Sequence, residues 1–301
     1  MNSFAHGVSA DGRVVVGTAA SSASPQRIVR WTAAGIEDLG APGTNGGGVA
    51  HAASGDGTWI VGQSIDGFRW SAATGFEQLA IADAVDVSDD GSVIVGFGLR
   101  WRNGEVTPLV PGGCLCWASA GSRDGVVVVG WYSTGHPDPR EDTHAFRWMD
   151  ASGLVDLGLL GEGREAAAEG TSANGSVIVG QARNKDGWWR AFRWTAGGGM
   201  VELGTLRNGL MSAASAVSAD GSVVVGRSLI TSSTGSERAF RWTAQQRRME
   251  DVREALLARG VTSVQNWILI SAVDVSADGR VIVGFGRNPS LQFEAWLAVL
   301  P

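Results

Sequence analysis

Long apolar runs, lysine and cysteine are scarce in this chain of 301 residues, and each scarcity argues against a class of protein. No stretch approaches the roughly 18 apolar residues that a membrane-spanning helix needs. Lys185 is the single lysine, and a net charge of −6 does not provide the positive footprint that nucleic-acid binding requires. Cys114 and Cys116 lie too close together for a loop-closing clamp, so we expect two small buried thiols rather than a metal pair.

The common templates of catalysis are also missing from the sequence. It contains no nucleophile elbow with a Ser-His-Asp order, no phosphate-binding loop and no Cys-x-x-Cys pair. The first residues, MNSFAHGVSADG, have neither the charged nor the apolar region of a signal peptide. We therefore expect no cofactor and no insertion into a membrane, and we favour a role other than catalysis.

Glycine, by contrast, is abundant, with 44 copies, and two glycines mark a tract that recurs seven times. Full copies read VSADGRVVVG from Val8, VSADGSVVVG from Val217 and VSADGRVIVG from Val275, and degenerate copies begin at Ala53, Val87, Gly121 and Thr171. The turn glycine always precedes the second glycine by five residues, whereas the interval between copies varies from 34 to 58 residues. A constant unit with variable connections indicates one supersecondary module used seven times.

The module has the pattern of four short antiparallel strands. Asp-Gly between apolar segments predicts a hairpin between the first two strands. The third strand carries an apolar-Arg-Trp triplet such as Phe192-Arg193-Trp194. The fourth strand has a short sequence of the type GLVDLG, which begins at Gly153. Four strands repeated about every 43 residues are typical of a β-propeller blade.

We therefore predict an all-β, seven-bladed propeller that forms a single domain over residues 1–301. The last unit ends at Pro301 without a fourth strand, so one blade is expected to be incomplete, and residues 250–259 are predicted to form a short helix. The approximate blades are 1–40, 41–80, 81–109, 110–158, 159–204, 205–252 and 253–301.

The recurring tryptophan and arginine of the third strand are interpreted as structural. Period-2 alternation places the Trp on one face of the blade, where it packs in the core between blades, and the Arg on the other face. An unpaired Arg between blades is costly, so we expect it to pair with an acid of the fourth strand. The candidate acids are Asp38, Asp156, Glu202 and Asp251.

These motifs resemble the HAF-repeat family of bacterial proteins. The residues that carry the resemblance are His144 to Trp148 (HAFRW), Arg190 to Trp194 (RAFRW), Arg238 to Trp242 (RAFRW) and the C-terminal EAWLAVLP. The resemblance covers essentially the whole chain. It implies an extracellular or cell-surface location and brings no general catalytic residues with it.

The connection between the second and third strands is the part of the module that varies most in length, and binding surfaces usually form on such loops. The longest of these loops contains the aromatic candidates Trp131 and Tyr132. It also holds residues suited to metal binding or acid–base work, but their spacing matches no standard template, and a solvated polar loop is the simpler interpretation. These polar candidates are His136, Asp138, Asp142 and His144.

Two further constellations lie on the same side of the predicted disc. Trp188 and Trp189 are adjacent, so one is expected to face the core and the other to stack on a sugar or base ring. The first strands place one residue per blade at an equivalent channel position, where polar candidates converge on the axis; facing channel water is the simpler interpretation. These channel candidates are His6, His51 and Glu169.

The leading hypothesis is a secreted or surface-exposed monomeric propeller that binds a glycan or a protein ligand on its variable-loop face through Trp131, Tyr132, Trp188 and Trp189. An alternative is an enzyme at the channel mouth, a hydrolase or lyase acting on a polysaccharide or another extracellular substrate, with His51, His136, Asp138, His144 or Glu169 as its catalytic groups. A third interpretation is a structural spacer in a larger surface protein.

Overall fold

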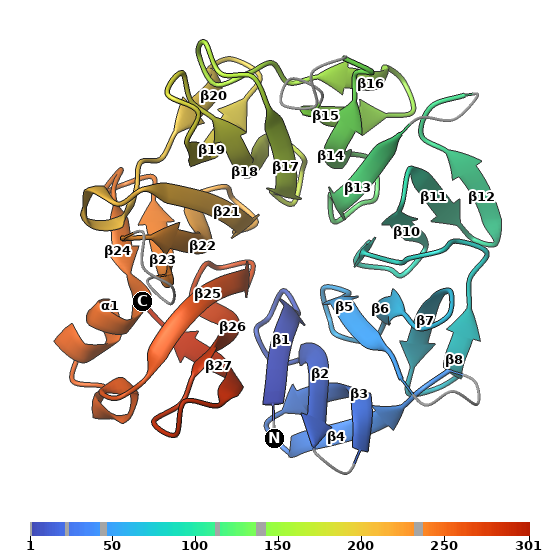
Figure 1. The fold of residues 1–301 in the computed structure, drawn as a ribbon. Coiled ribbons are helices and arrows are strands. Elements are labelled where there is room, and N and C mark those ends of the chain that lie inside the picture. The colour runs from blue at the N-terminus through green and yellow to red at the C-terminus, as the bar shows by residue number, and fades with distance from the viewer. Residues whose placement is uncertain (1, 22–23, 43–46, 112–114, 137–142, 232–236) are drawn as a thin grey trace.

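Seven antiparallel sheets surround a central axis in the computed structural model, which describes residues 2–21, 24–42, 47–111, 115–136, 143–231 and 237–301 (Figure 1). Within these residues, six sheets have four strands and the seventh has three. The predicted seven-bladed propeller with one incomplete blade is confirmed.

The strands of each blade follow one another in chain order from the axis outward (Figure 1). Blades 1 to 4 contain β1 (Asn2–Val8), β2 (Val15–Ser21), β3 (Ser24–Thr32) and β4 (Gly35–Gly40); β5 (Val49–Ala53), β6 (Ile60–Gln63), β7 (Gly67–Ser71) and β8 (Gly75–Gln78); β9 (Asp86–Val87), β10 (Val93–Gly96), β11 (Leu99–Arg102) and β12 (Glu105–Pro108); β13 (Cys116–Gly121), β14 (Val128–Ser133), β15 (Thr143–Met149) and β16 (Gly153–Asp156). Blades 5 to 7 contain β17 (Ala166–Thr171), β18 (Val177–Arg183), β19 (Trp189–Thr195) and β20 (Gly199–Glu202); β21 (Met211–Val217), β22 (Val223–Leu229), β23 (Glu237–Thr243) and β24 (Met249–Asp251); β25 (Ile268–Val275), β26 (Val281–Arg287) and β27 (Phe293–Val299).

The predicted helix is present as α1 (Val252–Ala258), between blades 6 and 7. Asp251 caps it by accepting hydrogen bonds from the backbone N–H groups of Arg253 and Glu254. Two single-turn 3-10 helices are also present: η2 (Leu206–Asn208) connects blades 5 and 6, and η3 (Thr262–Val264) follows α1 in the connection to blade 7. No helix in the described part of the chain has the length and apolar character needed to cross a membrane.

Each Ser-x-Asp-Gly hairpin is held by its own serine. The buried Ser9 hydroxyl donates to the Asp11 carboxylate at 2.7 Å and accepts from the backbone N–H of Val14 at 3.0 Å. The same two bonds recur in all seven turns, with Asn174 replacing the aspartate in blade 5. The repeated motif therefore codes a self-contained turn.

The two glycines of the motif are required for different reasons. Gly221 has a φ of 74°, and a Cβ on it would lie 2.4 Å from Val177 of the preceding blade. A Cβ on the second glycine of blade 5, Gly180, would lie 2.1 Å from the carbonyl oxygen of Ala167, where β17 bulges. The corresponding glycines of the other blades meet equivalent obstacles, so the spacing of five residues fixes how blades and strands approach.

The tryptophans of the third strands pack between blades as predicted, and the arginines of the first three blades stack on the tryptophan of the next blade. The guanidinium of Arg69 lies 4.6 Å from the ring centroid of Trp101 in the next blade, and that of Arg100 lies 4.8 Å from Trp148. Both tryptophans are buried. The third strands of blades 1 to 3 thus contribute an aromatic ring to one interface and a cation to the other.

The predicted acid partners of these arginines are wrong. Glu37 pairs with Arg30 at 2.7 Å and Glu77 with Arg69 at 2.6 Å, because these residues lie directly opposite one another in the register. The predicted acids are one residue further along and therefore point to the other face of the strand. Their partners are Arg27 for Asp38, His144 for Asp156, Arg190 for Glu202 and the helix N-terminus for Asp251.

The expected pair of free thiols is also wrong, because Cys116 is disulfide-bonded; Cys114 lies outside the described residues. Our expectation rested on the small loop that such a bridge closes. Loop size sets how much a bridge contributes to stability, not whether it forms.

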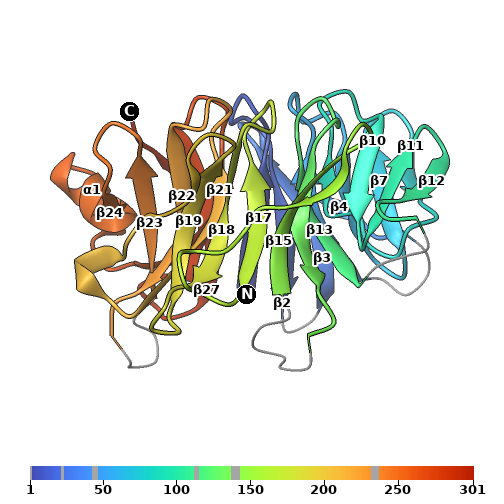
Figure 2. The same cartoon turned by 90° about the horizontal axis from the view of Figure 1, so that it is seen from above.

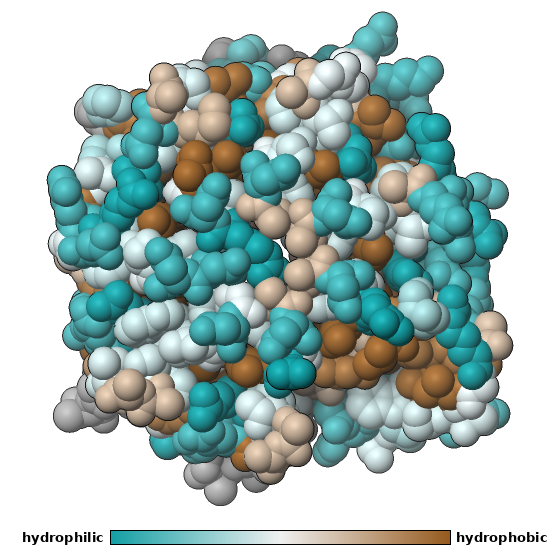
Figure 3. Space-filling model, turned by 180° about the vertical axis from the view of Figure 1, so that it is seen from behind, coloured by the Kyte–Doolittle hydropathy of each residue, from teal (hydrophilic) through white to brown (hydrophobic). Residues whose placement is uncertain are grey.

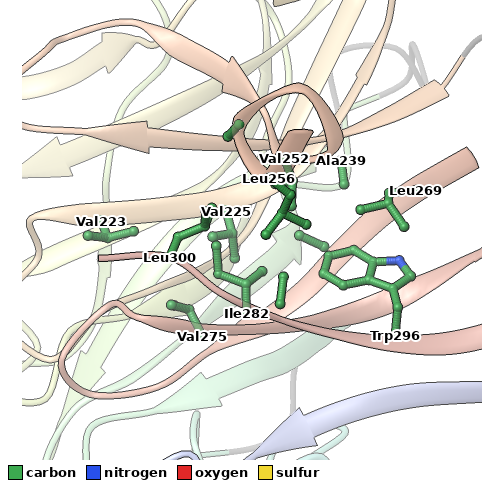
Figure 4. Packing of buried hydrophobic residues seen from close by; sticks show 13 residues of the cluster. Val223, Val225, Ala239, Val252, Leu256, Leu269, Val275, Ile282, Trp296 and Leu300 are labelled. Carbon is green, nitrogen blue, oxygen red and sulfur yellow. The ribbon is translucent and has the colours of Figure 1, made fainter. Parts of the chain in front are cut away.

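Packing between blades 6 and 7 shows how α1 replaces a longer fourth strand. Val252 and Leu256 of α1 point into a cluster with Ile282, Trp296 and Leu300 (Figure 4). Each such buried side chain contributes about 1.5–3 kcal/mol. Leu300 is fully buried there, so the end of the chain is part of the core.

The ring closes between blades 7 and 1 through side chains and a few backbone bonds. Asp274 accepts from the backbone N–H of Val8 at 2.8 Å, and Ser3 accepts from that of Ala295 at 3.0 Å. The ring of Phe4 lies 5.4 Å from that of Phe285. The described residues contain no strand from blade 1 that joins the sheet of blade 7.

Candidate functional site

The two faces of the disc carry different connections. The chain begins β1 at one face and ends after β27 at the opposite face, as Figure 2 shows. The face at which the chain ends also carries the uniform first hairpins and the links between third and fourth strands. We call it the turn face (Figure 3). The face at which β1 begins carries the variable connections. We call it the loop face, and it is turned to the viewer in Figure 1.

The axis of the propeller encloses a cavity of about 190 Å³. Its wall includes one residue from each blade, in or next to the innermost strand, at the position singled out in the sequence. The seven are His6, His51, Val85, Ser119, Glu169, Ser215 and Val273. The structure therefore brings the predicted channel residues together, including the three polar candidates.

Burial perturbs the titration of two of these groups. It lowers the pKa of His6 to about 4, assisted by the nearby His51, whose ring centroid is 6.3 Å away. It raises the pKa of Glu169 to about 7, against the opposing effects of Arg227 and a hydrogen bond from Gln181. His51 lies 3.3 Å from a carboxylate oxygen of Asp83. The channel is therefore polar on the loop-face side, and at neutral pH His6 is uncharged there.

Two aspartates deeper in the channel join neighbouring blades. Asp86 accepts from the backbone N–H of Gly121 at 2.8 Å, just as Asp274 accepts from that of Val8. Burial raises the pKa of Asp86 to about 6 and that of Asp274 to about 7. Because backbone donors occupy their oxygens, we assign these carboxyl groups a structural role.

The channel is constricted at the turn face by a belt of backbone hydrogen bonds. The residue between Ser and Asp in each turn donates to, or accepts from, the same residue of the next blade, at 2.8–3.1 Å, across six interfaces. The pairs are Ala277–Ala10, Ala10–Gly55, Asp89–Arg123, Arg123–Ala173, Ala173–Ala219 and Ala219–Ala277. The Asp89–Arg123 ion pair of 3.1 Å lies directly over Gly55. A ligand of appreciable size therefore has access from the loop face.

A groove of about 290 Å³ lies on the loop face between blades 5 and 6. Trp189 and Leu229 give it apolar walls, and its polar walls include the ion pair Arg227–Glu237, whose charged atoms are 3.7 Å apart. The Arg183 guanidinium sits 4.8 Å from the Trp189 ring centroid. We call the following residues the groove: Gln181, Trp189, Met211, Ser212, Ala213, Arg227, Leu229 and Glu237.

The adjacent Trp188 is 43% exposed, whereas Trp189 is half-buried in the wall of the groove. The two rings do divide between a more buried and a more exposed position, but Trp189 lines a groove rather than the core. The contributions of Arg227 and Glu237 were missed by the sequence analysis, because they come from the neighbouring blade and share no motif with Trp189.

An aromatic patch occupies another part of the loop face, between blades 3 and 4. Trp131 stacks on Trp117 with ring planes 5° apart, and Phe97 meets Trp117 edge-on at 4.8 Å. Phe97 is 50% exposed and Leu115 is 77% exposed. Trp131 was a predicted ligand-binding residue, whereas Phe97 and Trp117 were not; their signal was an aromatic residue at the end of a strand next to a variable connection.

Of the remaining candidates of the long loop, His144 and Tyr132 contact Asp156 of the fourth strand. Asp156 binds both His144 at 2.6 Å and the hydroxyl of Tyr132 at 2.7 Å. Burial opposes the shift, but the hydrogen bonds from His144, Tyr132 and the Gly158 backbone, together with the charge of His144, lower the pKa of Asp156. Burial and Asp156 raise the pKa of Tyr132 to about 12. His136 is exposed, and Asp138 and Asp142 lie outside the described residues. The described residues contain no group of three or more His, Cys, Asp or Glu suited to a metal ion.

No protein-family model and no curated protein sequence matches the chain. Solved structures similar to it include the β-propeller domain of the Trilobed protease from Pyrococcus furiosus, with an open velcro topology (TM-score 0.60, 12% identity, 98% of this chain and 93% of that one). Another is a puromycin hydrolase S511A mutant (TM-score 0.57, 14% identity, 99% of this chain and 52% of that one). A third is TolB from Acinetobacter baumannii (TM-score 0.52, 14% identity, 79% of this chain and 63% of that one). The chain spans about 63% of that TolB and about half of that hydrolase, and the likeness establishes the propeller fold alone.

Proposed function

We propose that this propeller is a binding module whose groove between blades 5 and 6 takes a carbohydrate. The observation that carries the proposal is the combination of Trp189 with the polar side chains Gln181, Arg227 and Glu237 in one groove on the loop face. An indole ring stacks on the apolar face of a sugar, while amide, guanidinium and carboxylate groups bind its hydroxyls. At about 290 Å³ the groove suits a short glycan segment.

Action outside the cytoplasm is part of the proposal. The disulfide at Cys116 supports it, since such bonds persist in oxidising compartments. The resemblance to HAF-repeat proteins points the same way. Fractionation of cells that produce the native protein tests this part: recovery in the cytoplasm with reduced cysteines contradicts it.

The test of the groove is binding to a glycan array, followed by calorimetric titration of each positive glycan. We expect Trp189→Ala and Arg227→Met each to weaken binding by about tenfold or more. Phe97→Ser, which changes an exposed aromatic residue of the distant patch, is the matched control and is expected to bind like the wild type.

A protein partner is the second candidate, favoured by the exposed aromatic patch of Phe97, Leu115, Trp117 and Trp131. The same variants separate the two functions. Silence of the glycan arrays, together with capture of a defined protein that depends on Phe97 and not on Trp189, replaces the first candidate with the second.

A further inference from the structure

β27 is the outer strand of blade 7, and within the described chain no strand pairs with its far edge. Leu297 and Val299 on this strand are 51% and 57% exposed. On the turn face, apolar side chains gather over blade 7, as Figure 3 shows. The other six blades cover this edge of the third strand with a fourth strand, and they therefore define what fits it.

The six fourth strands share a pattern. An apolar residue lies opposite the tryptophan position: Ile36, Phe76, Val106, Leu154, Met200 or Met249. Three residues later comes a leucine, or Val252 in blade 6. The backbone N–H of this leucine donates to the third strand, as in Leu203 to the Ala191 carbonyl at 2.8 Å and Leu157 to the Ala145 carbonyl at 3.0 Å.

In blades 1, 4 and 5 the residue before this leucine is an acid that pairs with a basic residue of the third strand. Arg190 pairs with Glu202 at 2.9 Å, and equivalent pairs join Arg27 to Asp38 and His144 to Asp156. Phe192 and Trp296 occupy equivalent places opposite the second glycines Gly180 and Gly284, so the counterpart of Arg190 in blade 7 is Glu294. The charge at the edge of blade 7 is therefore inverted.

Glu294 is partly buried and held in place, because Asn288 donates to its carboxylate at 2.9 Å. Further along β27, Leu297 stands where the third strands of the other blades have an arginine. An apolar residue in the partner strand suits the position opposite Leu297; in blades 4 and 5 Val155 and Val201 occupy the corresponding position of the fourth strand. A strand that completes this sheet thus needs a basic residue where this chain's own fourth strands have Asp38, Gln78, Pro108, Asp156, Glu202 and Asp251.

We propose that the edge of β27 binds an extended segment of a partner protein that pairs antiparallel to it and completes blade 7, with the sequence pattern apolar–apolar–Arg or Lys–Leu. Main-chain hydrogen bonds give the segment affinity, and the Glu294 pair together with the Leu297 contact gives it specificity. A second copy of this chain is a poor occupant, since none of its fourth strands offers the basic residue. The surface is separate from the groove and does not depend on the function proposed for it.

The experiment compares two synthetic peptides by calorimetry and by amide chemical shifts of the full chain. One is the fourth strand of blade 4 with its acid reversed, GLVRLG; the control is its natural sequence, GLVDLG. We expect the Arg peptide to bind at least about tenfold more tightly, with shifts confined to β27 and its neighbours. Glu294→Arg is expected to reverse the preference, and Leu297→Lys, an exposed position, to abolish binding while the melting temperature stays near that of the wild type.

Three results overturn the proposal: neither peptide binds the folded chain at millimolar concentration, the two bind equally, or Leu297→Lys leaves binding unchanged. Sedimentation tests the other occupant. A wild-type dimer that Leu297→Lys converts to a monomer assigns the edge to self-association and also overturns the proposal. Glycan binding through Trp189 is measured separately, so the two functions fail or succeed independently.

Discussion

At the scale of single residues, the second glycine of each repeat permits the close approach of two strands. The first strand contains a bulge, and a carbonyl oxygen beside it occupies the space of a missing side chain, as at Gly180. The repeat spacing predicted that this position matters. It did not predict why, because the bulge is visible only once the two strands are paired.

Replacing this glycine with alanine is expected to destabilise the fold. In Gly180→Ala the added methyl group overlaps the Ala167 carbonyl, so the strands must separate, and we expect a loss of about 2–3 kcal/mol in the free energy of unfolding. Gly197→Ala is the control, since nothing lies near its Cβ, and it is expected to change stability by less than about 0.5 kcal/mol. Denaturant unfolding measures both; equal stabilities refute the close contact.

At the scale of elements, each third strand joins its blade to the next. Arg100 binds both oxygens of Asp150 in blade 4, at 2.8 and 2.9 Å, while it stacks on Trp148. The sequence predicted a structural arginine and a buried tryptophan in the third strand of six of the seven repeats. It could not predict the acid from the following blade, because blade-to-blade register is a tertiary property.

The planar, bidentate geometry of this contact makes lysine a poor substitute. A lysine at position 100 keeps the charge but loses one hydrogen bond and most of the stacking, so we expect Arg100→Lys to lose about 1–2 kcal/mol of stability. Arg102→Lys serves as the control, because Arg102 is about half exposed and lies 3.9 Å from the same Asp150. Thermal and denaturant unfolding compare the two; a greater loss in Arg102→Lys contradicts the assignment.

At the scale of the whole molecule, the ring is closed around a channel with buried carboxyl groups. Asp274 holds blade 7 to blade 1, and its burial, together with the charge of Asp86 and against that of Arg123, raises its pKa from 3.8 to about 7. Between these values the native state holds a proton that the unfolded chain has released. The contribution of the protonated Asp274 carboxyl to the free energy of unfolding is therefore fully present below about pH 4 and is lost as the pH rises to about 7.

Asp274→Asn removes this titration. We expect the wild type to lose stability relative to the variant as the pH rises from about 4 to about 7, by at most about 4 kcal/mol at about 1.4 kcal/mol per pKa unit, because ionising the buried carboxyl is unfavourable. Asp90→Asn is the control. Hydrogen bonds from Ser88 and Ser92 lower the pKa of Asp90 to about 2, so its contribution changes only below about pH 4. Unfolding curves across this range decide the matter; a constant difference between wild type and Asp274→Asn contradicts it.

The sequence by itself determined the seven repeated modules, their four-strand order, the helix, the incomplete blade and the residues that ring the axis. These follow from local turn chemistry and from alternation along a strand, both of which are written within one repeat. Only the tertiary structure decided the groove of Trp189 with Arg227 and Glu237, the edge-on contact of Phe97 with Trp117, and the open edge beside Leu297. Each of these depends on side chains from different blades or on the strand that a blade lacks, and a single repeat contains no information about its neighbour's side chains.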